Sequence, residues 1–262
     1  MAEAKVLVKQ YFQHLDAKFR GAYAIHTGVP LLDDAGGLHP GELAVLAAPP
    51  GVGKTVLATL MACHAATSGT HVLWFALCET AMHAIERFLR VESHTAPSIL
   101  RTARVLRQDM TNLTYAAATL SRSPLEIVDD IDFDAAAIRE RVEQWRQSED
   151  GSRGLIVIDY LQLIASEHDP IAALRSLLGT AKQTRVAMLL LSQHIADLRE
   201  RTAIEGIATA TMYLRADLDV HELVLAKHRY ARTPAVETIR LDGKVSEIES
   251  LELSGSAAGP AS

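Results

Sequence analysis

Short apolar runs alternate along this chain with segments in which apolar residues recur at helical spacing. The first three runs, at residues 42–48, 71–77 and 125–130, are each followed by such a helical segment. Two later runs, at 154–164 and 186–193, lack period-two alternation of apolar and polar residues, which is typical of strands covered on both faces. This order predicts βαβ units around a parallel sheet, with the two later runs as central strands.

The pattern changes after residue 210. Four short segments rich in β-favouring residues follow one another, at 211–216, 221–230, 235–242 and 245–250. Consecutive strands joined by short turns pair antiparallel. We therefore expect an α/β fold in which a mostly parallel central sheet, flanked by helices, ends in antiparallel strands.

The two ends of the chain differ from its middle. Residues 1–20 place apolar side chains at mostly helical spacing and predict an amphipathic helix, through Val6, Val8, Tyr11, Phe12, Leu15 and Phe19. Residues 251–262 are small, polar and unpatterned, so we expect a disordered tail there. Residues 21–250 are predicted to form one domain.

The composition limits the classes of protein to consider. The chain has 262 residues, of which 48% are hydrophobic, enough for a sizeable core. Its cysteines are Cys63 and Cys78, and its start lacks a secretory apolar segment, so we expect a reducing, cytoplasmic location. No run approaches the ~20 apolar residues of a membrane span. The net charge of −6 means that nucleic-acid contact requires a local basic surface.

A loop rich in glycine and proline joins the first apolar run to the first helical segment. A phosphate-binding loop needs backbone N–H groups at a helix N-terminus, a lysine for the β and γ oxygens, and a hydroxyl for Mg²⁺. The loop supplies these groups within one segment: Ala48, Pro49, Pro50, Gly51, Val52, Gly53, Lys54, Thr55 and Val56. Alanine stands where the usual pattern begins with glycine.

The surroundings of this loop favour nucleotide binding over a plain strand-to-helix turn, because a buried-strand pattern precedes it and a helical pattern follows. Mg²⁺ on a triphosphate is also held by a carboxylate at the end of a neighbouring strand. Asp159, which ends the apolar run LIVID, is the candidate. The alternative interpretation is a turn residue at a strand end.

Six segments together resemble the motor domain of the DnaB-like replicative helicases, a branch of the RecA-like ATPases. They are GLHPGELAVLAAPPGVGKT, HVLWFAL, GLIVIDYLQLI, LLLSQ, ADLRERTAIEG and LAKHRYARTPAVE. The resemblance covers residues 21–250 and implies a RecA-like fold that binds ATP and Mg²⁺ and acts on single-stranded DNA. It also implies a homo-oligomeric ring, a hexamer, with other replication proteins as partners. We expect a motor domain alone, without the family's N-terminal primase-binding domain.

The resemblance also implies roles for particular residues. Lys227 and Arg229 match a K-x-R element that reaches the γ-phosphate of a neighbouring subunit; otherwise they are a basic pair at a strand edge. Gln193 matches a sensor between the nucleotide and the DNA-facing loops, although a glutamine at a strand end is usually an ordinary hydrogen-bonding residue. The helix at 1–20 resembles a segment that packs on the adjacent subunit, and packing on its own domain is equally ordinary.

The sequence departs from the family at the position of its catalytic glutamate. Cys78 stands there and Glu79 follows, and a one-residue shift can point a side chain to the opposite side. Glu79 is therefore a candidate to orient the attacking water, whereas we expect Cys78 to be a buried packing residue. The loops expected to line a DNA channel are short, and the basic residues of the second one are Arg199 and Arg201.

Two groups that suggest metal sites have simpler explanations. His83 and Glu86 lie three residues apart on a predicted helix, which indicates a solvated face. The carboxylates of 129–134 precede a helical segment, where an N-cap and the helix dipole favour them. The sequence has no HExxH or Gly-x-Ser-x-Gly motif, so a zinc or serine hydrolase is not supported.

Two functions remain open from the sequence. One is a ring-forming, ATP-hydrolysing motor on single-stranded DNA, in which Glu79 positions water and Lys227 and Arg229 act on a neighbour. The other is a nucleotide-regulated, oligomeric accessory or scaffold protein that is related to DnaB, hydrolyses ATP weakly and lacks helicase activity. Cys78, the short loops and the negative charge motivate the second.

Overall fold

The structure is a computed structural model of the 262-residue chain. It describes residues 4–6, 8–9, 11–12, 24–102, 104–129, 134–148, 154–164, 169–193, 198–217, 220–241 and 249–250. The described residues of the predicted N-terminal helix are helical, and the rest of that prediction lies outside the described residues. The predicted disordered tail also lies outside them.

One sheet contains all the strands of the described residues, in the order β3-β2-β4-β5-β1-β6-β7-β8-β9. Neighbouring strands are parallel from β3 to β6 and antiparallel from β6 to β9. The predicted α/β fold is therefore confirmed, including its antiparallel C-terminal end. The strands are β1 Leu43–Ala48, β2 His71–Ala76, β3 Leu125–Val128, β4 Gly154–Asp159, β5 Ala187–Gln193, β6 Ala210–Asp217, β7 Val220–His228, β8 Ala235–Arg240 and β9 Glu249–Ser250.

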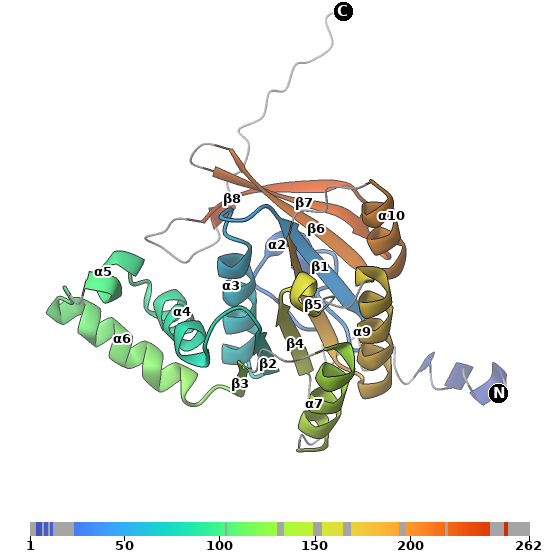
Figure 1. The fold of residues 1–262 in the computed structure, drawn as a ribbon, viewed down its shortest axis with the longest axis horizontal. Coiled ribbons are helices and arrows are strands. Elements are labelled where there is room, and N and C mark those ends of the chain that lie inside the picture. Colours follow the sequence, from blue (N-terminus) through green and yellow to red (C-terminus); the bar gives the residue numbers. More distant parts are fainter. Residues whose placement is uncertain are drawn as a thin grey trace, which may run out of the picture.

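Helices cover both faces of this sheet (Figure 1). α3 and α4 lie on one face and α7 and α9 on the other, while α5 and α6 lie beyond α4. The helices are α2 Pro30–Asp33, α3 Lys54–Thr67, α4 Ala81–Ser93, α5 Pro97–Thr102, α6 Arg107–Leu120, α7 Ala135–Ser148, α8 Leu161–Ile164, α9 Pro170–Thr184 and α10 Leu198–Ile207.

The central strands are buried because they contribute to two cores. Alternate residues of a strand point to opposite faces of the sheet. Ala44 and Leu46 of β1 join the core under α3 and α4, whereas Leu43 and Val45 join the core under α7 and α9. Burial on both faces explains why the apolar runs of the sequence show no alternation.

Two features of the sequence were interpreted incompletely. The run 154–164 was treated as one apolar strand run, but it holds two elements: the strand ends at Asp159, as the Mg²⁺ assignment expected, and residues 161–164 form α8. Periodicity does not separate a short buried strand from a short buried helix, which is why α8 was missed. The helices α5 and α6 were not predicted.

The predicted N-cap is confirmed, since Asp134 accepts hydrogen bonds from the N–H groups of Ala136 and Ala137, at 2.9 and 2.7 Å.

Candidate nucleotide site

The loop between β1 and α3 has the backbone shape of a phosphate-binding loop. Ala48 ends β1, and Lys54 begins α3. Gly51 and Gly53 have φ values of 81° and 98°, which only glycine adopts without strain. At Gly53 a side chain would also stand 3.2 Å from Leu241 Cδ1. The loop therefore needs both glycines, and it delivers the chain to a helix N-terminus whose first N–H groups point outward.

A buried ion pair joins this loop to the neighbouring strand β4. Lys54 Nζ lies 3.4 Å from Asp159 Oδ1, and the two side chains are only 9% and 1% exposed. Asp159 Oδ2 is buried and has no partner among the described residues. Lys54 Nζ also lies 5.2 Å from the ring centroid of Tyr160. A buried carboxylate oxygen without a partner, on a side chain paired with the lysine that precedes Thr55 in the chain, fits a Mg²⁺–triphosphate group.

Gln193 lies at the same edge of the sheet. It ends β5, directly opposite Ala48 in the parallel pairing with β1. The side chain of Gln162, on α8, holds this strand end: its Oε1 accepts from Gln193 N–H and its Nε2 donates to Ser192 Oγ, both at 3.0 Å. Sequence reasoning missed Gln162, although it belongs to the quoted IDYLQL segment. The end of β5 is thus fixed beside the phosphate loop.

Cys78 and Glu79, which follow β2 after Leu77, have different surroundings. Glu79 is paired with Arg87 of α4, and each side chain is 15% exposed. Cys78 is exposed, so the expectation that it packs in the core was wrong. Partial burial and the carboxylates of Asp159 and Glu79 raise the pKa of the Cys78 thiol to about 11. This turn therefore places a neutral thiol within electrostatic reach of Asp159.

A cavity of about 290 Å³ adjoins the phosphate loop, between that loop, α4 and the C-terminal strands. It is lined by Gly51, Val52, Gly53, Val56, Arg87, Arg90, Val91, Thr95, His221 and Leu241. Among the described residues, Arg87 Nη1, Arg90 Nε and His221 Nδ1 are buried without a hydrogen-bond partner. Burial lowers the pKa of Arg90 from its ordinary value. These three lining side chains therefore have nitrogen atoms that are available to hydrogen-bond a ligand. The sequence pattern had not singled them out.

Lys227 and Arg229 lie at the opposite edge of the sheet. Arg229 N–H donates to Thr209 O at 3.0 Å, and Thr209 N–H donates to Leu43 O at 2.8 Å, at the start of β1. The phosphate loop begins at the other end of β1, roughly 16 Å away at the usual rise of a strand. Lys227 Nζ donates to the carbonyl of Ala208. The structure does not bring these two cations to the phosphate loop of their own chain.

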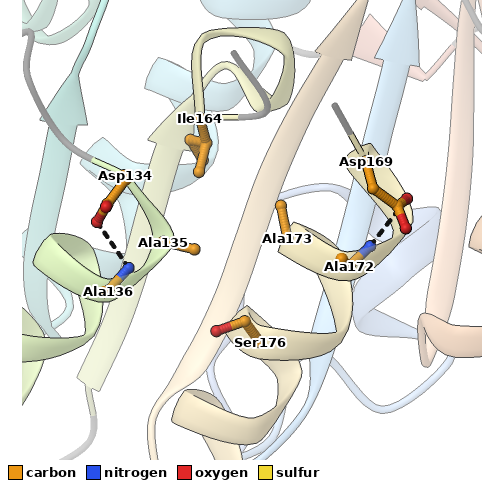
Figure 2. A pocket seen from close by; sticks show the side chains of 8 residues that line it. All are labelled: Asp134, Ala135, Ala136, Ile164, Asp169, Ala172, Ala173 and Ser176. Carbon is orange, nitrogen blue, oxygen red and sulfur yellow. Dashed lines mark hydrogen bonds between the residues drawn. The ribbon is translucent and has the colours of Figure 1, made fainter. Parts of the chain in front are cut away.

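A second cavity, of about 340 Å³, lies between the N-terminal ends of α7 and α9 (Figure 2). Its acidic residues are Asp134 and Asp169, and both cap helices: Asp169 Oδ1 accepts from the N–H groups of Ile171 and Ala172, at 2.8 and 3.1 Å. Most of the other lining residues are alanines. Both carboxylates serve as helix caps, and the described residues contain no group of three or more His, Cys, Asp or Glu side chains that could hold a metal ion.

Taken together, the phosphate loop after β1, its buried partner on β4 and the fixed end of β5 define a RecA-like P-loop nucleotide-binding domain. Residues 24–249 match the family described as the DnaB-like helicase C-terminal domain. The chain belongs to this family.

Relatives and solved structures agree with this assignment. The replicative DNA helicase DnaB of Geobacillus stearothermophilus is 29% identical over 237 residues, covering 78% of this chain and 52% of the relative. DnaB of Treponema pallidum is 29% identical over 262 residues, covering 89% and 58%. The chain thus spans little more than half the length of these relatives.

Two solved structures share the fold. The ATPase domain of G40P superposes with a TM-score of 0.85 at 20% identity, covering 96% of this chain and 100% of that domain. A DnaB-like replicative helicase, described with its interactions with primase, has a TM-score of 0.82 at 22% identity, covering 96% and 67%. Within the described residues, no helix is long and apolar enough to cross a membrane.

Proposed function

We propose that this chain is the MgATP-hydrolysing motor domain of a replicative helicase, working as a homo-oligomeric ring, a hexamer, on single-stranded DNA. One observation carries the proposal: the buried pair of Lys54 and Asp159 stands at a loop whose glycines adopt left-handed conformations. A buried lysine and a carboxylate with one unpaired oxygen are costly unless a ligand completes their bonding. Cytoplasmic location and a domain at residues 21–250, preceded by a linker-type helix, form part of this proposal.

The residues of the loop and of β4 take the following roles. Pro49 and Pro50 have no N–H group, so the backbone N–H groups of Gly51 to Val56 cradle the phosphates. Lys54 contacts the β and γ oxygens. Thr55 and Asp159 hold Mg²⁺, which when bound neutralises charge on the phosphate oxygens. Gln193 lies next to this site on β5 and is proposed to sense whether a γ-phosphate is bound.

The cation pair at the end of β7, Lys227 within the strand and Arg229 just after it, is proposed to act on a neighbouring copy. Lys227 and Arg229 are too far from their own loop, and Arg229 is exposed. In a ring, one edge of each subunit faces the other edge of the next, so these cations would meet the neighbour's γ-phosphate. A guanidinium delivered in this way stabilises charge that develops during phosphoryl transfer. Hydrolysis then depends on assembly.

Assembly itself is supported by the N-terminal segment. Val6, Val8, Tyr11 and Phe12 lie in its described helical residues and are 46–64% exposed. A run of exposed apolar side chains commonly marks a contact surface. We propose that this segment packs on the adjacent subunit and that further replication proteins are partners, as one structural neighbour is described with primase.

The test is ATP turnover with and without single-stranded DNA, at protein concentrations that allow rings to form. Particle size should be measured in parallel, with and without nucleotide. Stimulation by single-stranded DNA and growth of the particle to a ring support the motor function. Turnover that ignores DNA, at concentrations where rings exist, contradicts it.

A second candidate function rests on the residues after β2. Glu79 Oε2 is paired with Arg87, and the residue before it, Cys78, is an exposed thiol, so the carboxylate of this turn is already held in an ion pair, with its Oε1 buried. This arrangement favours a weakly hydrolytic, nucleotide-regulated accessory or scaffold protein. The Cys78→Glu variant separates the two functions: a sharp rise in turnover supports the scaffold, whereas brisk native turnover that Glu79→Ala abolishes supports the motor.

A further inference from the structure

An irregularity in the sheet decides where Lys227 points. Leu225 pairs with Met212 and belongs to the core under α3 and α4. Regular alternation would send Lys227, two residues later, to that same face. The pairing shifts between Thr211 and Met212, which leaves Ala226 as an extra residue on β7. A bulge of this kind re-aims the side chains that follow it, so Lys227 faces α10 instead.

On that face Lys227 is bound to the end of a helix. Its Nζ donates to the carbonyl of Ala208, the residue that follows α10, while Ala208 N–H donates to Ile204 O at 2.9 Å. The C-terminal end of a helix carries partial negative charge and unpaired carbonyls, both of which favour a cation. The position of the Lys227 ammonium is therefore tied to the last turn of α10.

Glu205 is the centre of a polar cluster in that last turn. Its Oε1 accepts from Arg201 Nε at 2.9 Å and from the Tyr213 hydroxyl, on β6, at 3.0 Å. The Arg201 guanidinium also lies over the Tyr213 ring, 4.6 Å from its centroid. Burial and the Glu205 carboxylate raise the pKa of Tyr213 to about 12, so its hydroxyl remains a donor at neutral pH. The cluster fastens α10 to the strand beside β7.

We propose that Glu205 is a positioning residue for the cation pair on β7: by neutralising Arg201 and fastening α10 to β6, it holds the Lys227 ammonium where Lys227 and Arg229 are presented together. The inference rests on the proposed function of that pair in a neighbour's site. Without the carboxylate, the Lys227 ammonium would lose the attraction of Glu205, while the repulsion from Arg229 would remain. Tyr213 would at the same time lose its charged acceptor.

The charges around Lys227 make this testable by pH. Along its own segment it neighbours His228 and Arg229, and from α10 the Glu205 carboxylate acts on it, while Arg201 and Tyr213 are bound to that carboxylate. Burial and Arg229 lower the pKa of Lys227, and the Glu205 carboxylate opposes this shift. Removal of that carboxylate should lower the pKa of Lys227 further, so that the ammonium is lost at a lower pH.

The experiment compares Glu205→Gln with the native chain and with Glu200→Gln, which makes the same change in the first turn of α10. For Glu205→Gln we expect kcat to fall about tenfold with the KM for ATP unchanged, and the alkaline limb of the pH–rate profile to move to lower pH. In the Lys227→Ala background the same substitution should have no further effect, because the two residues act through one contact. Glu200→Gln should leave all three quantities unchanged, and thermal unfolding checks that each variant is folded.

A second measurement does not depend on turnover. The ¹³Cε resonance of Lys227, assigned through Lys227→Arg, should titrate at lower pH in Glu205→Gln than in the native chain and be unaffected by Glu200→Gln. An unchanged Lys227 titration, or an equal loss of kcat with and without Lys227, overturns the proposal. If Lys227→Ala leaves turnover intact, the role of the cation pair fails instead, and the titration still decides whether Glu205 holds Lys227.

Discussion

The two edges of the sheet are built differently. At the carboxyl ends of the parallel strands, Lys54 and Asp159 are almost completely buried and already paired. At the other edge, Arg229 is exposed and Lys227 is bound to a helix end. The charged groups of the first edge are buried and suited to a ligand bound by the same chain. At the second edge, the charge of Arg229 faces outward.

This difference separates binding from hydrolysis. The groups proposed to bind phosphate in the ground state come from β1, α3 and β4 of one chain, so we expect a single copy to be sufficient to hold a nucleotide. Groups that stabilise the transition state are proposed to come from another copy, and only such groups raise the rate of the chemical step. Substitutions at the two edges should therefore have different kinetic effects.

The largest effect is expected at the buried edge. Lys54→Ala removes the cation that contacts the phosphates and leaves Asp159 buried without a partner. We expect ATP binding to weaken roughly 10²-fold and turnover to fall by roughly 10² to 10³ beyond that. Titration with a fluorescent nucleotide and steady-state turnover measure the two losses. Native affinity in this variant would contradict the assignment of the loop.

The exposed edge should give the complementary result. Arg229→Ala should leave ATP affinity unchanged and lower turnover by about 10³, the lower end of the range for a guanidinium supplied by a partner. Mixing Arg229→Ala with Lys54→Ala should restore part of the turnover, because at some interfaces the intact Arg229 of a Lys54→Ala subunit then meets the intact phosphate loop of an Arg229→Ala subunit. Absence of any recovery, in mixtures shown to co-assemble, would place Arg229 outside the site.

A third prediction concerns the residue proposed to orient water. Glu79→Gln keeps the shape of the side chain but removes its charge, so turnover should fall about 10²-fold with ATP affinity unchanged. The matched control is Glu86→Gln on α4, an exposed acidic residue of the same helix region. Equal turnover in both variants would mean that Glu79 serves only to pair with Arg87.

The buried edge was largely predictable from the sequence, and the reason is geometric. The carboxyl ends of parallel strands meet at one edge, so a phosphate loop after one strand, Asp159 after another and Gln193 after a third had to lie near one another. The local motif and the predicted strands were sufficient to place these residues at one edge of the sheet. The family resemblance supplied the role of Gln193 but was not needed to place it.

The rest depended on contacts between distant segments, which residue patterns do not record. Glu79 meets Arg87 because β2 leads into α4 at a particular angle, and no spacing rule states that angle. Lys227 faces α10 because of a bulge at Ala226. Nothing in the residue pattern of this strand marks Ala226 as the extra residue. Cys78 was expected inside the core because small thiols are usually buried, but the strand ends two residues before it.

The smallest expected effect concerns Cys78, whose exposure contrasts with its raised pKa of about 11. Only the thiolate is alkylated, and the higher pKa reduces its fraction at pH 8, although the more basic thiolate is also the better nucleophile. These opposing effects leave iodoacetamide about tenfold slower on Cys78 than on a free cysteine at pH 8. Because the carboxylates of Asp159 and Glu79 contribute to the shift, Asp159→Asn should speed the reaction. The rate should rise steadily from pH 7 to pH 10; a plateau near pH 9 would show that the thiol lies away from the acidic residues of the buried edge.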